Sequence, residues 1–346
     1  MLRSASVALC VVAFLSNLPG SNAAEALYGP KGVAPEAVRQ GTLGSCYFHA
    51  VIAALAERRA DTIRNMIQSN SDGSYTVTFG DGKKETAYPV DLRYTRESGY
   101  DLSDGLWVAV LFRAYAQRVL RQSLLQAIDG SDIFPLLKQP AEQLVGSSDQ
   151  LVLAYDRAIR AQVDQQGNIN RAELEAGLKK EMSPVTVPDS VKDALMGLLE
   201  TGGFFDKVVA MIQQNGELFG AYRAVGQGGI ADRAMETLAG STRFQENKSV
   251  SQAGAALSEA VSKGLPIVAC TGGSRIYQDL AKGQTLPSDT ANWYVNAHCY
   301  TVLSYDSAAG AVNIRNPWAH HPDPDGIFNL PLSDFLPAYA GIVTPQ

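Results

Sequence analysis

The seven residues Gln40-Gly-Thr-Leu-Gly-Ser-Cys46 stand directly before an apolar segment with helical spacing. The residues that share one face of this predicted helix are Phe48, Val51, Ile52 and Leu55. A thiol at the start of a helix lies near the positive end of the helix dipole, which favours the thiolate over the thiol. The pattern therefore predicts that Cys46 is a nucleophile and that the Gln40 amide is a hydrogen-bond donor to an oxyanion beside it.

A cysteine nucleophile needs a base, and the best candidate is His298. This histidine lies in residues 294–304, whose β-branched and aromatic residues predict a strand with His298 and Tyr300 on one face. A second predicted strand, 311–316, ends at Asn316, whose side-chain carbonyl can fix the tautomer of an imidazole. Trp318 follows closely and is expected to cover this histidine–asparagine hydrogen bond.

These motifs resemble those of the calpain-type cysteine peptidases. The segment from Gln40 to Cys46 is similar to the cysteine box of that family, usually Gln-Gly-x-x-Gly-Asp-Cys-Trp, with Ser45 and Tyr47 as departures. Asn316-Pro-Trp318 is identical to the family's asparagine motif, and Ala297-His-Cys-Tyr-Thr-Val302 resembles its histidine strand. Three further stretches agree with the family, namely Tyr88–Arg93, Leu106–Ala116 and Asp325–Leu336. The resemblance covers residues near 25–122 and 250–340. Gly-Ser-Cys-Tyr also fits the papain signature, but the Asn-Pro-Trp and Leu-Trp motifs favour calpain.

The resemblance implies an α+β, papain-like fold with a helical lobe that carries the cysteine and a β-rich lobe that carries histidine and asparagine. Its expected domains are 24–122 for the first lobe, 123–247 for an all-helical insertion and 248–346 for the second lobe. It assigns Cys46 as nucleophile, His298 as acid and base, Asn316 as orienting residue and Gln40 as oxyanion donor, with Trp318 supporting. The implied reaction is endopeptidase hydrolysis of protein or peptide substrates through a thioester on Cys46.

Two other interpretations of the same residues remain open. A different thiol acyltransferase or a deamidase would share the triad, and a non-catalytic binding module could retain the fold. His49 is a rival base, but it follows Cys46 on the same helix and leaves no cleft for a substrate, so we expect it to pack in the core. His320 and His321 precede Asp323 and Asp325 in a Pro-rich loop, where solvated side chains are more common than a metal site.

Calcium is a possible ligand by family resemblance, because calpain-type cores are generally aligned by calcium. The loop between Trp318 and Gly326 is short, however, and lacks the Gly-Glu-x-Glu-Trp continuation typical of the family. Asp323 and Asp325 supply few of the six or so oxygen ligands that calcium prefers. We therefore expect that the activity needs neither calcium nor another cofactor.

The N-terminus has the pattern of a signal peptide over residues 1–23. Arg3 supplies a positive charge, residues 7–15 are apolar, and Ser21-Asn-Ala23 suits cleavage. We therefore expect an exported protein, secreted or periplasmic, with no membrane span. A formal net charge of −6 argues against a nucleic-acid partner, and the oligomeric state is left open. Three cysteines remain after cleavage, so at least one is unpaired. Cys270 is most simply a buried strand residue, and whether it pairs with Cys299 stays open.

The remaining patterns predict the order of secondary structure along the chain. Residues 75–79 and 86–90 predict a hairpin around the Asp81-Gly82 turn. Helices are predicted near 107–115 and over 250–261, and a strand over 265–270. Residues 123–247 carry no recognisable catalytic residue. They are either a substrate-gating or partner-binding element or a passive surface insertion.

Overall fold

The computed structural model describes residues 25–129, 171–183, 221–246, 249–272, 293–322, 325–339 and 341–346. The predicted signal peptide and much of the predicted insertion lie outside the described residues. The described chain combines helices with antiparallel sheets, which confirms the α+β class. Within these ranges, no helix has both the length and the hydropathy needed to cross a membrane.

The first lobe is built around helix α2, Cys46–Arg58, every residue of which from Cys46 to Ala56 is buried. Small alanines alternate with large apolar side chains along this helix, so neighbouring elements can approach it closely on several sides. The elements that accompany it are the 3-10 helix η1 (Pro35–Ala37) and the helices α3 (Ala60–Met66), α4 (Pro89–Glu97), α5 (Trp107–Asp129), α11 (Ala221–Gly226) and α12 (Ala231–Ala239). A further helix, α8, spans Arg171–Met182.

A small three-stranded sheet belongs to the first lobe. Its strands are β1 (Ile67–Ser69), β2 (Tyr75–Thr78) and β3 (Lys84–Ala87), in the order β1-β2-β3. The β2–β3 pair is antiparallel and pairs Thr78 with Lys84 next to the Asp81-Gly82 turn. The structure thus confirms the predicted hairpin, and Gly82 adopts the positive φ of 79° that such a turn requires.

The second lobe is a six-stranded sheet in the order β4-β9-β5-β6-β7-β8. Its strands are β4 (Arg243–Glu246), β5 (Ile267–Cys270), β6 (Cys299–Asp306), β7 (Ala311–Arg315), β8 (Ile327–Pro331) and β9 (Gly341–Thr344). All neighbouring pairs are antiparallel, and β9 lies between β4 and β5. Helices α13 (Val250–Ser262) and α16 (Leu332–Ala338) complete the lobe. Ser249 caps α13 by accepting a hydrogen bond from the Gln252 N–H.

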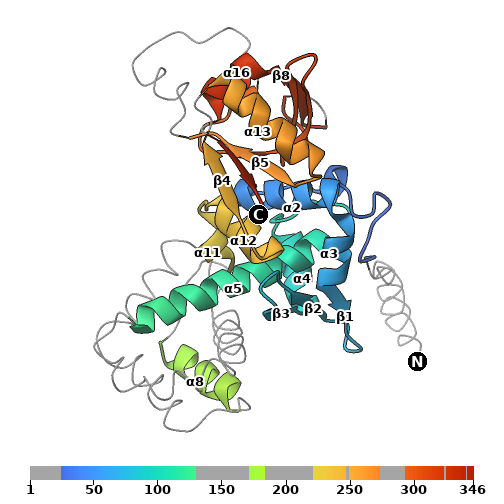
Figure 1. Cartoon of the computed structure of the whole chain (residues 1–346). Coiled ribbons are helices and arrows are strands. Elements are labelled where there is room, and N and C mark those ends of the chain that lie inside the picture. The colour runs from blue at the N-terminus through green and yellow to red at the C-terminus, as the bar shows by residue number, and fades with distance from the viewer. Residues whose placement is uncertain are drawn as a thin grey trace, which may run out of the picture.

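The large sheet is enclosed by helices on both faces (Figure 1). On one face Val268, Cys299 and Val343 join the hydrophobic core that surrounds α2. On the other face Ala269 and Tyr300 pack in a second core with residues of α13 and α16. Because the sheet is buried on both sides, its central strands are apolar almost throughout, as the run at β5 shows.

Direct hydrogen bonds join the two lobes. The Arg315 guanidinium donates to the Val38 carbonyl at 2.6 Å, and the Gln40 backbone N–H donates to the Pro317 carbonyl at 2.9 Å. At the centre of the interface the buried Thr301 hydroxyl donates to the Ala50 carbonyl at 2.8 Å. The segment that leads into α2 is therefore fixed to the loop after β7 by backbone and side-chain bonds.

Two expectations about residues 123–247 are corrected by the structure. The segment is not all helical, because Arg243–Glu246 forms strand β4 and pairs with β9. Nor does the first lobe end at residue 122, since α5 continues without a break to Asp129. Helix α11 packs against α5 and α12 packs against α2, so the last part of the predicted insertion belongs to the lobe that carries Cys46.

Candidate active site

A cleft of about 790 Å³ lies between the two lobes. The first lobe contributes Gln40 to Gly44, Cys46 and the loop from Gln227 to Asp232. The second lobe contributes residues around the start of β6, including His298, and residues of β4, β9 and the loop after β7. Among the predicted site residues, Gln40, Cys46, His298 and Trp318 therefore share one cavity, and Asn316 adjoins it through His298.

Cys46 is the first residue of α2; it lines the cleft and is 8% exposed. It is the free cysteine of the described chain. Burial raises the pKa of the Cys46 thiol, although the backbone N–H groups of Cys299, Tyr47 and Cys46 itself act in the opposite direction. The sequence predicted a thiolate from the position at the helix start, but desolvation by burial outweighs that contribution to the pKa of Cys46.

His298 lies directly before β6, whereas the sequence predicted it inside a strand over 294–304. Its Nε2 is 2.9 Å from the Asn316 Oδ1, in a pair that is almost fully buried. Because an amide oxygen can only accept, Nε2 carries the proton of the neutral imidazole and Nδ1 holds the free lone pair. Burial is the main cause that lowers the pKa of His298 to about 4, with His321 acting in the same direction and the Asn316 bond opposing it.

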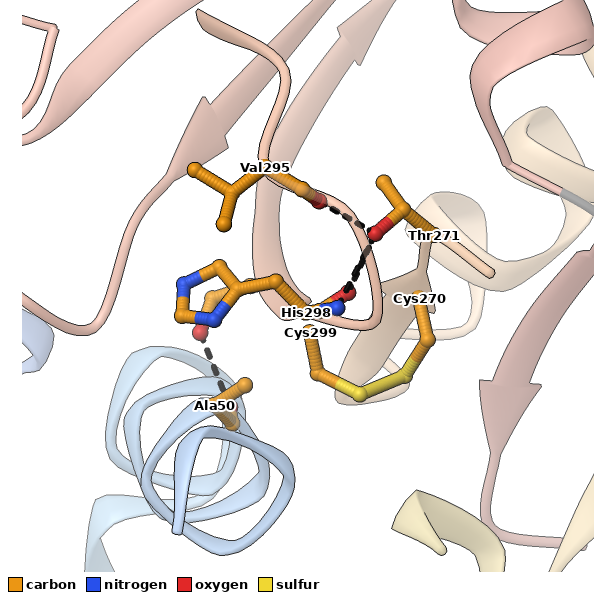
Figure 2. The surroundings of a disulfide bond; sticks show 7 residues. Ala50, Cys270, Thr271, Val295, His298 and Cys299 are labelled. Carbon is orange, nitrogen blue, oxygen red and sulfur yellow. Dashed lines mark hydrogen bonds between the residues drawn. A yellow bond between two sulfur atoms is a disulfide. The ribbon is translucent and has the colours of Figure 1, made fainter. Parts of the chain in front are cut away.

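The backbone around His298 is fixed by Thr271, the residue after β5. The Thr271 hydroxyl accepts the His298 N–H at 3.0 Å and donates to the Val295 carbonyl at 2.5 Å (Figure 2). Between them Ala297 adopts a φ of 50°, a left-handed conformation that costs energy for a residue with a side chain. The Thr271 hydrogen bonds thus hold Ala297, the residue before His298, in an otherwise unfavourable backbone conformation.

A disulfide joins Cys270 to Cys299 beside this turn. The two cysteines are a directly opposite pair of β5 and β6, so the sheet register brings them together. Figure 2 shows the disulfide and the His298 imidazole projecting in different directions. Cys270 is thus a strand residue that forms a disulfide, a pairing that the sequence left open. Cys46 remains as the free thiol of the described residues.

Asn316 is fully buried and organises the turn after β7. Besides His298, its Oδ1 accepts the Trp318 backbone N–H at 3.1 Å. The Trp318 ring lies 4.5 Å from the His298 ring, between centroids, which fits the predicted covering role. Gly326 is required behind the turn, because it has a φ of 67° and a Cβ there would lie 2.9 Å from the Asn316 carbonyl oxygen.

Gln40 lines the same cleft as Cys46 and is 6% exposed. Its Nε2 donates to the Leu43 carbonyl at 2.6 Å. An amide nitrogen has two hydrogens, so this bond orients the group and leaves a second donor. Gly41, next in the chain, approaches the Gly99 carbonyl so closely that a Cβ would lie 1.9 Å from it.

The other histidines occupy different surroundings. His49 is fully buried in the first lobe, where its Nδ1 donates to the Ser45 carbonyl at 3.0 Å and its ring packs near Phe112. It does not line the cleft. His320 donates to the Trp318 carbonyl, and His321 lies near the Trp318 ring. Asp323, which the sequence considered beside them, lies outside the described residues. In the described ranges no three His, Cys, Asp or Glu side chains form a group that could hold a metal ion.

No protein-family model matches this chain, and neither does any curated protein.

Sequence reasoning missed the loop Gln227–Asp232 as part of the cleft. Gly44 forms a parallel bridge with Gln227, and the Gly44 N–H donates to the Gly226 carbonyl at 2.8 Å. Gly229 packs on the Tyr47 ring, where a Cβ would come within 2.3 Å of a ring carbon. The double glycine at 228–229 was the signal, since glycines permit such close approach.

The depressed pKa of His298 makes the stability of the protein depend on pH. Since the unfolded pKa of about 6.5 exceeds the folded value of about 4, the unfolded chain binds more protons between these values. Above pH 6.5, this difference in the pKa of His298 contributes to the free energy of unfolding. About 3 kcal/mol of that contribution is lost as the pH falls toward 4. Urea unfolding of the wild type and His298→Gln at pH 7, 5 and 4 should show a smaller acid loss in the variant. Parallel losses in both proteins would contradict the assignment.

Proposed function

We propose that the protein is a cysteine endopeptidase with a papain-like arrangement of two lobes, in which Cys46, His298 and Asn316 form the catalytic triad. The observation that supports this best is the hydrogen bond from His298 Nε2 to Asn316 Oδ1. It leaves Nδ1 as the basic atom of an imidazole that shares a cleft with a thiol at a helix start.

In the proposed reaction both groups of the dyad start neutral, in agreement with a raised pKa of Cys46 and a lowered pKa of His298. His298 Nδ1 takes the thiol proton as the sulfur attacks the carbonyl carbon of the scissile peptide bond. The Cys46 backbone N–H and the Gln40 side chain donate to the resulting oxyanion. The imidazolium then protonates the leaving amine, and the acyl group stays on sulfur as a thioester.

The second half of the reaction uses the same residues in the opposite direction. His298, again neutral, removes a proton from water, which attacks the thioester carbonyl. The oxyanion forms in the same place, and the sulfur leaves with the proton returned by His298. Asn316 keeps the imidazole in one orientation throughout, and Trp318 excludes water from their hydrogen bond.

A deamidase or another thiol acyltransferase would use the same steps with a different acceptor or leaving group. The cleft between the lobes is large and its walls are rich in glycine backbone, which favours an extended peptide over a small amide. A non-catalytic binding module would not need the oriented His298–Asn316 pair. We also propose, from the pattern of residues 1–23, that the enzyme acts after export.

The test is to incubate the protein without residues 1–23 with a peptide library and with casein, and to read the products by mass spectrometry. A thiol-reactive peptidyl probe should label Cys46 in the wild type and nothing in Cys46→Ala. Internal cleavage of peptides supports the endopeptidase. Ammonia release or acyl transfer without cleavage would indicate a deamidase or another acyltransferase. If neither labelling nor any product is observed, the result would indicate the non-catalytic binding module.

We expect the activity to be independent of calcium. Val38 and Gln40 of the first lobe are bonded to Arg315 and Pro317 of the second, and Thr301 reaches α2, so the lobes are aligned by the chain itself. Metal-stripped protein assayed in excess chelator should therefore cleave peptides at the same rate as protein with added calcium. Activity that disappears in chelator and returns only with calcium would show that an ion aligns the lobes.

A further inference from the structure

The formal charge in the cleft is negative and comes from one carboxylate among the described residues. Of the described residues that line it, Asp232 is the one with an acidic or basic side chain, apart from the neutral His298. Asp232 is half-buried in the first turn of α12. No hydrogen bond or ion pair joins its carboxylate to another side chain in the described part of the molecule. An unpaired carboxylate in an otherwise uncharged cleft attracts a cationic group of whatever enters it.

Exposed apolar side chains lie in the same part of the cleft. Ile230 is 56% exposed and Phe244 is 52% exposed, the two highest values among the large hydrophobic residues in the described ranges. Both line the cleft together with Val343 and Cys46. Exposed apolar residues that gather in a cavity beside a reactive group are typical of a binding surface.

The fold brings these residues together from distant parts of the sequence. Ile230 and Asp232 stand at the start of α12, which packs against α2 and β9. Phe244 of β4 is opposite Val343 of β9. The Phe244 ring lies over Gly341, and a Cβ on Gly341 would come within 2.7 Å of a carbon of that ring. Strands β4 and β9 and the start of α12 thus form one wall of the cleft, with an apolar surface and one carboxylate.

A structural role for Asp232 accounts for only part of this arrangement. An acidic residue in the first turn stabilises a helix through the dipole, and Ile230 provides no side-chain cap. That role does not explain why two large apolar side chains stay exposed in the cleft beside the carboxylate. The adjacent Arg233 does not line the cleft, and its charge acts on Tyr115.

We infer that this wall is a specificity site for a lysine or arginine side chain of the substrate. The aliphatic stem would lie on Ile230 and Phe244, while the cationic head pairs with the Asp232 carboxylate. This inference rests on the proposed endopeptidase and names its substrate class: peptides with a basic residue near the scissile bond.

The test compares fluorogenic peptides that differ only by lysine or norleucine at each of the four positions before the scissile bond. Norleucine retains the stem of lysine without its charge, so the comparison isolates the ion pair. At one position the wild type should cleave the lysine peptide with a kcat/KM about tenfold above that of the norleucine peptide. Asp232→Asn should remove this preference by lowering the kcat/KM of the lysine peptide about tenfold, toward that of the norleucine peptide. Phe244→Ala should slow both peptides.

Glu236→Gln is the matched control, because it removes the same charge from the same helix at an exposed position outside the cleft. It should change neither rate. Equal rates for lysine and norleucine peptides at every position, or an equal loss for both in Asp232→Asn, would overturn the inference while leaving the endopeptidase intact.

A binding measurement separates this inference from the proposed reaction. Cys46→Ala should bind the lysine peptide about tenfold more tightly than the norleucine peptide, and Cys46→Ala with Asp232→Asn should bind both alike. If the wild type cleaves no peptide but this binding preference is present, the peptidase proposal fails and the basic-residue site stands. If neither cleavage nor binding preference is found, both fail.

Discussion

Cys46→Ala is expected to lower the rate of peptide hydrolysis by about 10⁴ or more, to the background of the assay. The sulfur is the atom that attacks the substrate, and the methyl group of alanine offers no replacement. The rate should be measured with the best fluorogenic peptide from the library, at protein concentrations high enough to detect a residual rate.

The fold should survive this substitution. Cys46 starts a helix in which alanine is already frequent, and alanine is the best helix former. Urea unfolding should therefore give a free energy of unfolding within about 1 kcal/mol of the wild type. A variant that remains folded and still hydrolyses peptides would exclude Cys46 as the nucleophile.

His298→Ala is expected to cause a comparable loss, about 10⁴ in kcat, because the thiol then lacks the base that removes its proton. Asn316→Ala should be less damaging, since Asn316 orients the imidazole and transfers no proton. The three proteins should be compared with the same peptide over a range of pH. At alkaline pH the His298→Ala loss should shrink, because the thiol ionises without help as the pH approaches its raised pKa.

His49→Gln is the control for this series. His49 lies one turn along α2 from Ser45, is buried, and does not reach the cleft. Glutamine can also donate to the Ser45 carbonyl, so the variant should fold and retain its kcat. A large loss in His49→Gln with little effect of His298→Ala would exchange the roles of the two histidines.

The elements that depend on local sequence could be predicted well. Helix α2 follows from the apolar spacing after Cys46, the β2–β3 hairpin from Asp81-Gly82, and β7 from the β-branched residues before Asn316. In each of these segments neighbouring residues alone determine the preference, so no knowledge of the distant chain is needed.

The features that depend on distant contacts could not be predicted. Strand β4 is mostly exposed and has no alternating pattern, and it is a strand because β9 pairs with it. The three cysteines after residue 23 allowed several pairings until the β5–β6 register placed Cys270 opposite Cys299. Asp232 gave no signal in the sequence, because its position in the cleft follows from the packing of α12. The raised pKa of Cys46 likewise follows from its burial in the folded chain.

The place of β9 in the large sheet affects the order of events during folding. This strand, residues 341–344, follows all the proposed catalytic residues in sequence, yet it lies between β4 and β5. Until it has left the ribosome, β4 has no partner, β5 has a free edge, and the wall that holds Phe244 and Val343 is incomplete. A growing chain that already contains Cys46, His298 and Asn316 thus has an incomplete cleft. Under the proposed function, a chain synthesised only as far as residue 340 would therefore lack hydrolytic activity.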